Sequence, residues 1–190
     1  IPGRITHVMP NLGATIEAKG ALITAAWSCG PSAWGVIKVL GDTPDEPLQA
    51  DQIDIRCHGA ILAAGWCADS AILRQADQMQ ARGVILGSIR PDMIDAARQF
   101  AIPIVITEGF GDIPMNPAAF QLLKAHDGNE LSLLNSAPPN EETPENILPA
   151  LTDGTPPLPV PPAALQVGDA VRIIGYPRLG HTGRIAALST

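Results

Sequence analysis

The sequence predicts a mixed α/β protein that carries additional β-structure at both ends of the chain. Three observations support this prediction. Short β-prone runs separated by Gly and Pro fill residues 3–40, strand-like and helix-like runs alternate over residues 53–126, and a Pro-rich stretch precedes a Gly-punctuated tail. We therefore expect a small β-barrel or sandwich (1–50), an α/β unit (51–135), a Pro-rich linker (136–163) and a terminal β-hairpin (164–190).

The composition is that of a globular protein with a sizeable core. The 190 residues are 46% hydrophobic and 16% charged, which suffices for one main domain with an appendage. Only 4% of the residues are aromatic, so we expect a core built from Ala, Ile, Leu and Val.

The first segment reads as an antiparallel meander or small barrel. Its β-prone runs are GRITHVM, GATIEA, ALITAAW and WGVIKVL, and Gly- or Pro-containing stretches separate them. The acidic stretch GDTPDEPLQADQ that follows is expected to be a loop.

The α/β unit shows three strand-like runs, IDIRCHGAILAAG, VILGS and IPIVIT, each followed by a helix-like run. The first helix has Asp69 as its expected N-cap and Gly83 as its expected C-cap, and the third begins at Asn116 with Pro117 in its first turn. The second helix-like run, PDMIDAARQFA, starts at a proline turn. Because parallel strands need crossover connections, this alternation predicts a βαβαβα unit with a parallel sheet.

The linker, APPNEETPENILPALTDGTPPLPVPP, is predicted to be extended and partly polyproline in character. Within it, NILPAL reads as an edge strand, because proline interrupts strand pairing.

The tail VGDAVRIIGYPRLGHTGRIAAL has the most specific local pattern in the chain. Apolar residues fall where two strands need them, and glycines permit a tight loop and a return strand. Residues 168–185 resemble the KOW motif of ribosomal proteins and transcription elongation factors. The matching residues are Gly168, Asp169, Val171, Ile173, Gly180, Gly183 and Ile185.

This resemblance implies an SH3-like module that contacts RNA or protein. Its RNA-binding residues would be Arg172, Arg178 and Arg184. Two features depart from the family pattern: Leu179 and His181 flank Gly180 where the family often has Lys, and the chain stops at Thr190, too soon for a full barrel. The alternative is a terminal hairpin that docks on its own domain.

A second candidate site lies where the predicted parallel strands end. Carboxyl ends of parallel strands share one sheet edge, where ligands usually bind, and helix N-termini there favour anions. Carboxylates could instead hold a divalent metal. A purely structural interpretation also holds, with Asp69 and Asp92 as helix caps and the glycines as turn residues. The candidate ligand-binding residues are Ser88, Arg90, Thr107, Glu108, Gly109, Gly111 and Asp112.

Charge and cysteine content narrow the function classes. A net charge of −7 argues against broad binding of nucleic acid, although residues 161–190 carry three basic groups and one acidic group. Cys29, Cys57 and Cys67 form no CxxC pair, and their spacing to His58 matches no zinc module, so we expect no metal site and a reducing, cytoplasmic setting. The sequence has no phosphate-binding GxxxxGK[ST] motif and gives no indication of a cofactor.

These observations predict a non-enzymatic binding or assembly protein whose KOW-like tail contacts a protein or RNA partner. The rival is an α/β unit that binds a small anion or metal, or catalyses a reaction, at the strand ends. Association with further copies of the chain stays open. We expect no membrane contact from this fragment, because no run of about 20 apolar residues occurs. The chain begins at Ile1 without Met, which leaves a preceding anchor or signal open.

Overall fold

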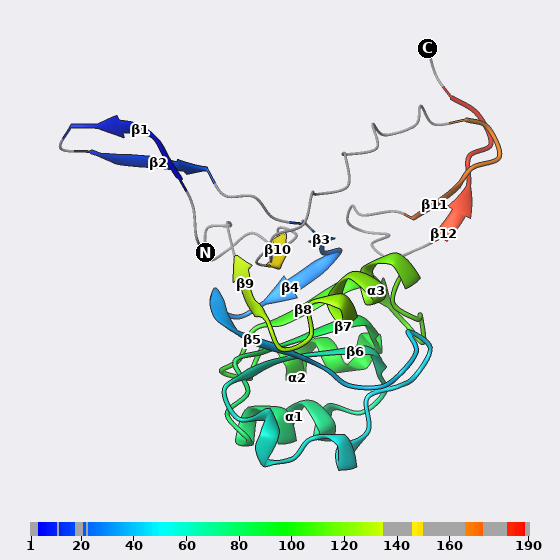
Figure 1. Ribbon diagram of the computed structural model, residues 1–190. Coiled ribbons are helices and arrows are strands. Elements are labelled where there is room, and N and C mark those ends of the chain that lie inside the picture. Colours follow the sequence, from blue (N-terminus) through cyan, green and yellow to red (C-terminus); the bar gives the residue numbers. More distant parts are fainter. Residues whose placement is uncertain are drawn as a thin grey trace.

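The computed structural model describes residues 4–10, 12–17, 21, 23–134, 146–149, 166–172 and 182–188. Within these residues the strands form one eight-stranded sheet and two separate two-stranded sheets, and together with the helices they make a mixed α/β protein (Figure 1). The small sheets are the hairpin of β1 (Arg4–Met9) with β2 (Gly13–Glu17) and the pair β11 (Ala170–Arg172) with β12 (Thr182–Arg184).

The large sheet contains most of the described strands. Its spatial order is β3 (Ile23–Thr24), β10 (Asn146–Pro149), β9 (Glu130–Leu134), β5 (Ala33–Val39), β6 (Ala60–Cys67), β7 (Gly83–Ile89), β8 (Ile104–Phe110) and β4 (Trp27–Cys29). The helices are α1 (Ser70–Gln78), α2 (Ile94–Ala97) and α3 (Pro117–Ala125), with the 3-10 turns η1 (Ala50–Gln52), η2 (Ile55–Cys57) and η3 (Pro91–Met93).

The centre of this sheet is parallel, as the alternation of strands and helices predicted. Strands β5, β6, β7 and β8 pair in parallel, while β3, β4, β9 and β10 pair antiparallel to their neighbours. The predicted βαβαβα order is confirmed as β6-α1-β7-α2-β8-α3.

The N-terminal part differs from the predicted barrel or sandwich over residues 1–50. Only β1 and β2 form a local antiparallel hairpin, with Ile5 opposite Ile16 and Val8 opposite Ala14. Strands β3, β4 and β5 belong instead to the large sheet, where β5 lies in parallel register with β6. The local Gly and Pro pattern identified these strands but not their partners, because strand pairing depends on contacts distant in sequence.

The predicted linker over 136–163 falls outside the described residues except for β10. This strand was expected at a sheet edge, but it lies between β9 and β3. Its pairing with β3 covers only Asn146 and Ile147, so Pro149 lies beyond that pairing. The missing N–H of proline therefore costs no hydrogen bond on that side.

Alternate residues of the central strands build two cores, one on each face of the sheet. One core receives Leu73 and Ala76 from α1, Met93 from η3 and Ala97 from α2, and the other receives Phe120 and Leu123 from α3. Strands β6 to β8 are covered on both faces, so their sequences are almost continuously apolar rather than alternating. The aromatic-poor composition is consistent with this packing of small helices on aliphatic strands.

The helix boundaries follow the predicted caps at their N-termini. The side chains of Asp69 and Asn116 accept hydrogen bonds from the backbone N–H groups of Ala71 and Ala118, at 2.8 and 2.9 Å. The predicted C-cap of α1 at Gly83 is wrong, because Gly83 already belongs to β7. The left-handed residue after α1 is Gln80, at φ 55°, in a position where glycine is usual.

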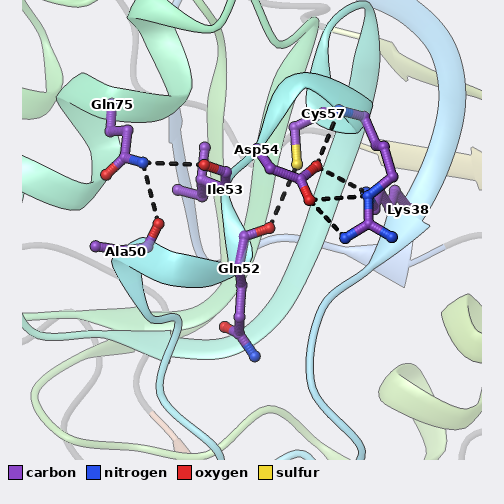
Figure 2. Close-up of polar contacts among 8 residues, drawn as sticks. Lys38, Ala50, Gln52, Ile53, Asp54, Cys57 and Gln75 are labelled. Atoms are coloured by element: carbon purple, nitrogen blue, oxygen red, sulfur yellow. Dashed lines mark hydrogen bonds and ion pairs between the residues drawn. The ribbon is translucent and has the colours of Figure 1, made fainter.

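The segment that carries η1 and η2 is fastened to α1. The Gln75 side chain donates to the carbonyl oxygens of Ala50 and Ile53, at 3.0 and 2.9 Å (Figure 2). The buried residues Ile53 and Cys57 join the core beneath α1. This segment therefore extends the covered part of the sheet from α1 towards β5.

Candidate functional site

The predicted ligand residues at the strand ends do come together. Ser88 near the end of β7 is in register with Gly109 of β8. Thr107 and Glu108 lie on β8, and Gly111 and Asp112 follow directly after it. Gly109 and Gly111 have φ values of 130° and 122°, which permit the turn that leads towards α3.

The Ser88 hydroxyl holds this turn in place. Its side chain is completely buried. The hydroxyl accepts a hydrogen bond from the Ile113 N–H at 2.9 Å and lies 2.6 and 2.7 Å from the carbonyl oxygens of Gly111 and Ile113. One hydroxyl hydrogen serves two carbonyl acceptors, so the group is fully engaged by the loop backbone.

The neighbouring polar side chains also contact the backbone around this turn. The Thr107 hydroxyl is buried and donates to the Leu86 carbonyl oxygen at 3.4 Å, and a Glu108 carboxylate oxygen accepts from the Asn116 N–H at 3.3 Å. The first contact joins β8 to β7, and the second holds the connection between β8 and α3. These residues therefore have structural roles in addition to any ligand role.

Arg90 and Asp112 are both exposed. The Arg90 guanidinium is 3.5 Å from the Asp92 carboxylate in the first turn of η3. Ion pairs between exposed groups contribute roughly 0–1 kcal/mol, so this contact restrains Arg90 little.

Backbone from two loops lies directly on this edge of the sheet. A Cβ atom on Gly65 would come within 2.2 Å of the Pro44 carbonyl oxygen, and one on Gly87 within 2.4 Å of the Met115 nitrogen. The Met115 N–H also donates to the Pro44 carbonyl oxygen at 3.3 Å, which joins the two loops. Loop backbone thus covers β6 and β7 near their carboxyl-terminal ends, where a ligand would otherwise bind.

The cysteines and histidines form no metal centre within the described part of the chain, where no group of three or more His, Cys, Asp or Glu is placed to hold an ion. Cys57 and Cys67 are buried, and burial raises the pKa of the Cys67 thiol to about 11. A thiol with a raised pKa is a poor nucleophile and a poor metal ligand.

A polar cluster that the sequence did not indicate lies at the opposite, amino-terminal edge of β6. A hollow of about 400 Å³ is lined there by Lys38, Arg56, His58 and Asp127, together with their backbone neighbours. A second hollow of about 500 Å³ contains His58 and Arg82. A 3.0 Å hydrogen bond between His58 Nε2 and Gln80 Oε1 joins the turn before β6 to the turn after α1.

Asp54 organises the cations of this cluster (Figure 2). Its carboxylate accepts hydrogen bonds from the backbone N–H and the side chain of Arg56, and lies 3.7 Å from the Lys38 ammonium. The hydrogen bonds from Arg56 lower the pKa of Asp54 from 3.8 to about 2. One carboxylate therefore faces two cations.

An exposed apolar surface on β5 and β9 is the second feature that the sequence did not locate. Trp34 is 65% exposed, Val36 46% and Leu134 39%. A hollow of about 540 Å³ lies here, lined by Ser32, Ala33, Trp34 and residues 130–134. The sequence placed Trp34 in a β-prone run, but its exposure depends on which helices cover the sheet.

The tail is described only in part. Strands β11 and β12 pair antiparallel, with Ala170 opposite Arg184 and Val171 opposite Gly183. The Arg184 guanidinium donates to the Gly168 carbonyl oxygen at 2.9 Å. Arg178 and the side chain of Arg172 lie outside the described residues.

Across the ranges that the structure describes, no helix is both long enough and apolar enough to cross a lipid bilayer.

Replacing Ser88 with alanine should destabilise the fold by about 1–3 kcal/mol, because the Ile113 N–H and two carbonyl groups lose their buried partner. The free energy of unfolding from urea denaturation measures this loss. Asp112→Ala is the matched control on the same loop and should change stability by less than about 0.5 kcal/mol. Equal effects of both substitutions would contradict the structural role of Ser88.

Replacing Arg56 with glutamine should raise the pKa of Asp54 from about 2 towards 3.8, because the ionised carboxylate loses its main hydrogen-bond donor. A depressed pKa in the folded state means that this contact stabilises the fold above the unfolded pKa. The stabilisation is lost as the pH falls from about 4 through 2. Carboxyl NMR titration of both proteins gives the values, and an unchanged midpoint in Arg56→Gln would disprove the assignment.

Comparisons with known proteins do not identify a family. No protein-family model matches the chain, and no curated protein matches it. Among solved structures, the RNA-processing inhibitor RraA from Thermus thermophilis is similar to 68% of this chain and 85% of its own chain, at 13% identity and a TM-score of 0.40. A likeness of this size does not identify a function.

Proposed function

We propose that the protein is a non-enzymatic binding or assembly protein that docks a partner on the exposed face of β5 and β9. The single observation that carries this proposal is the exposure of Trp34, at 65%, beside Val36 and a hollow of about 540 Å³. Exposed apolar patches of this kind mark interaction sites, and tryptophan is enriched among the residues that dominate binding energy.

The contrast with the strand-end residues supports the same proposal. Ser88 and Glu108 contact the backbone of the β8-to-α3 connection, Thr107 contacts that of β7, and two loops lie on Gly65 and Gly87. Small-molecule sites are usually concave and largely preformed. A surface with an exposed aromatic ring fits partner binding better than it fits catalysis.

The tail is proposed as a second contact region, through its KOW-like pattern over residues 168–185. The antiparallel pairing of β11 with β12 supports a hairpin of the kind that this motif forms. Three arginines against one acidic group give residues 161–190 a positive charge in an otherwise acidic chain. Such a tail suits an RNA or an acidic protein surface.

A thermal-shift panel tests the choice between a binding protein and a small-ligand protein. We expect phosphates, nucleotides, carboxylates and divalent metals to leave the melting temperature unchanged, because a ligand stabilises only a state that binds it. Glu108→Ala and Asp112→Ala are the controls at the strand ends. A shift that either substitution abolishes would overturn the proposal and move the function to that edge.

The tail is tested by filter retention of a short single-stranded RNA at low salt. Arg178→Gln combined with Arg184→Gln should reduce retention and flatten its salt dependence, because each phosphate contact contributes about −0.7 to the log–log slope. Lys124→Gln, on helix α3, is the control that removes a positive charge outside the tail. Absence of retention by the unmodified chain would exclude RNA as the partner of the tail.

A further inference from the structure

The face of the sheet that carries α1 and α2 is incompletely covered. Helices α1 and α2 and the segment with η1 and η2 pack over β6 to β8. On β5 this cover stops short, because Trp34 and Val36 remain exposed while Ile37, on the other face of the strand, is 1% exposed. We call the surface made by Trp34 and Val36 of β5 and Leu134 of β9 the open face.

The Trp34 indole offers a hydrogen-bond donor as well as an apolar ring. Its N–H group has no hydrogen-bond partner among the residues that the structure describes, whereas the indole N–H of Trp66 donates to the Asp45 carbonyl oxygen at 2.9 Å. Proline-rich segments in the polyproline II conformation make no internal hydrogen bonds, so their carbonyl oxygens remain free to accept. Grooves lined by aromatic rings are the usual binding sites for such segments.

The chain itself contains a segment of this chemistry. Residues 154–165, GTPPLPVPPAAL, include five prolines and no charged residue. Three of the prolines, Pro156, Pro159 and Pro162, recur at every third position, which places them along one side of a polyproline II helix with three residues per turn. This segment lies outside the described residues, so its conformation is an inference from sequence.

The segment follows a strand that ends close to the open face. Figure 1 shows β10 beside β9, and Leu148 of β10 is in register with Ser132 of β9, which is in register with Trp34. With neighbouring strands roughly 4.8 Å apart, β10 lies about 10 Å from β5 at this level. Pro156 follows the end of β10 by seven residues, which can span up to about 25 Å. The segment can therefore reach Trp34 within one chain.

Charge favours this segment over the other proline-containing stretch that adjoins the open face. Residues 135–145, which join β9 to β10, carry three glutamates. The exposed Glu130 lies in register with Val36 and so shares the open face, where it would repel these carboxylates. Residues 154–165 are uncharged, so neither Glu130 nor the net charge of −7 opposes their binding.

We propose that residues 154–165 bind the open face of their own chain in the polyproline II conformation, with prolines on the Trp34 ring and a backbone carbonyl accepting from the indole N–H. The inference rests on the proposed docking role of this face and adds the class of ligand that it takes. Within one chain the segment acts at an effective concentration in the millimolar range, so contacts that are weak between separate molecules suffice. A protein partner of the open face would have to displace this segment.

The first measurement is the exposure of the Trp34 indole N–H in the complete chain. Its signal in a proton–nitrogen correlation spectrum is the one missing from Trp34→Phe, and broadening by a soluble gadolinium chelate reports its exposure. Pro156→Gly, Pro159→Gly and Pro162→Gly combined should shift this signal. The broadening should increase about threefold or more, because the ring loses an intramolecular ligand that is bound most of the time.

A synthetic peptide of residues 154–165 tests the same contact between separate molecules. Fluorescence polarisation of the labelled peptide should show binding to the triple-glycine chain and several-fold weaker binding to the unmodified chain, whose own segment competes. The peptide with the same three prolines replaced by glycine should not bind. Adding Trp34→Ser to the triple-glycine chain should abolish peptide binding, and adding Trp34→Phe should only weaken it, because the ring remains and the N–H donor is lost.

The matched control removes the same number of prolines from the other stretch. Pro138→Gly, Pro139→Gly and Pro144→Gly combined should leave the Trp34 signal and its broadening unchanged. Equal effects of the two triple substitutions would contradict the choice of residues 154–165. Thermal melting and light scattering of each variant check that the fold is retained and that the chain is monomeric.

The outcomes separate the inference from the proposed function. A Trp34 signal equally accessible in all chains, without peptide binding, would overturn the inference and leave the open face free for a partner. Protection removed by Ile5→Thr with Val8→Thr would assign the face to the hairpin of β1 and β2, and protection found only in a dimer would assign it to a second copy. Either result overturns the inference. Protection that persists in every variant would mean that the ring is not exposed, which would overturn the docking role as well.

Discussion

The close crossing of loop backbone over Gly65 and Gly87 is the constraint on which the arrangement of this protein depends. At both positions a side chain would collide with backbone atoms rather than with a side chain that could move. The two loops can lie against β6 and β7 only because these residues lack a Cβ atom. Ser88 then fixes the second loop through the Ile113 N–H. This crossing covers the edge where ligands of parallel sheets commonly bind.

Because loop backbone covers the carboxyl-terminal edge of the parallel strands, a functional surface can also lie on other parts of the sheet. The polar residues that the sequence gathers there contact the protein's own backbone: Thr107 donates to Leu86 of β7, and Glu108 accepts from Asn116 at the start of α3. Arg90 and Asp112 remain exposed at that edge, and further exposed groups lie on the open face of β5 and in the cluster around Asp54. Both regions lie on the face of the sheet where the cover next to α1 consists of the short 3-10 turns η1 and η2. Incomplete cover of one sheet face is thus the structural origin of the proposed docking surface.

The sequence predicted local features well where a local interaction determines them. The caps Asp69 and Asn116 were identified correctly because a capping side chain bonds a backbone group two residues away. The parallel order of β6, β7 and β8 followed from the alternation of strands and helices. The C-terminus of α1 was misplaced, because Gln80 adopts a left-handed conformation that sequence reasoning assigns to glycine.

By itself, the sequence determined the mixed α/β class, the parallel centre, the N-terminal helix caps and the clustering of Ser88 with residues 107–112, since each follows from local pattern and chain connectivity. Only the tertiary structure decided that β3, β4 and β5 join the large sheet, that loop backbone covers Gly65 and Gly87, and that Trp34 remains exposed. Strand pairing, close backbone crossings and side-chain exposure all depend on contacts between residues distant in the chain. The local pattern of apolar residues in a strand does not determine these contacts.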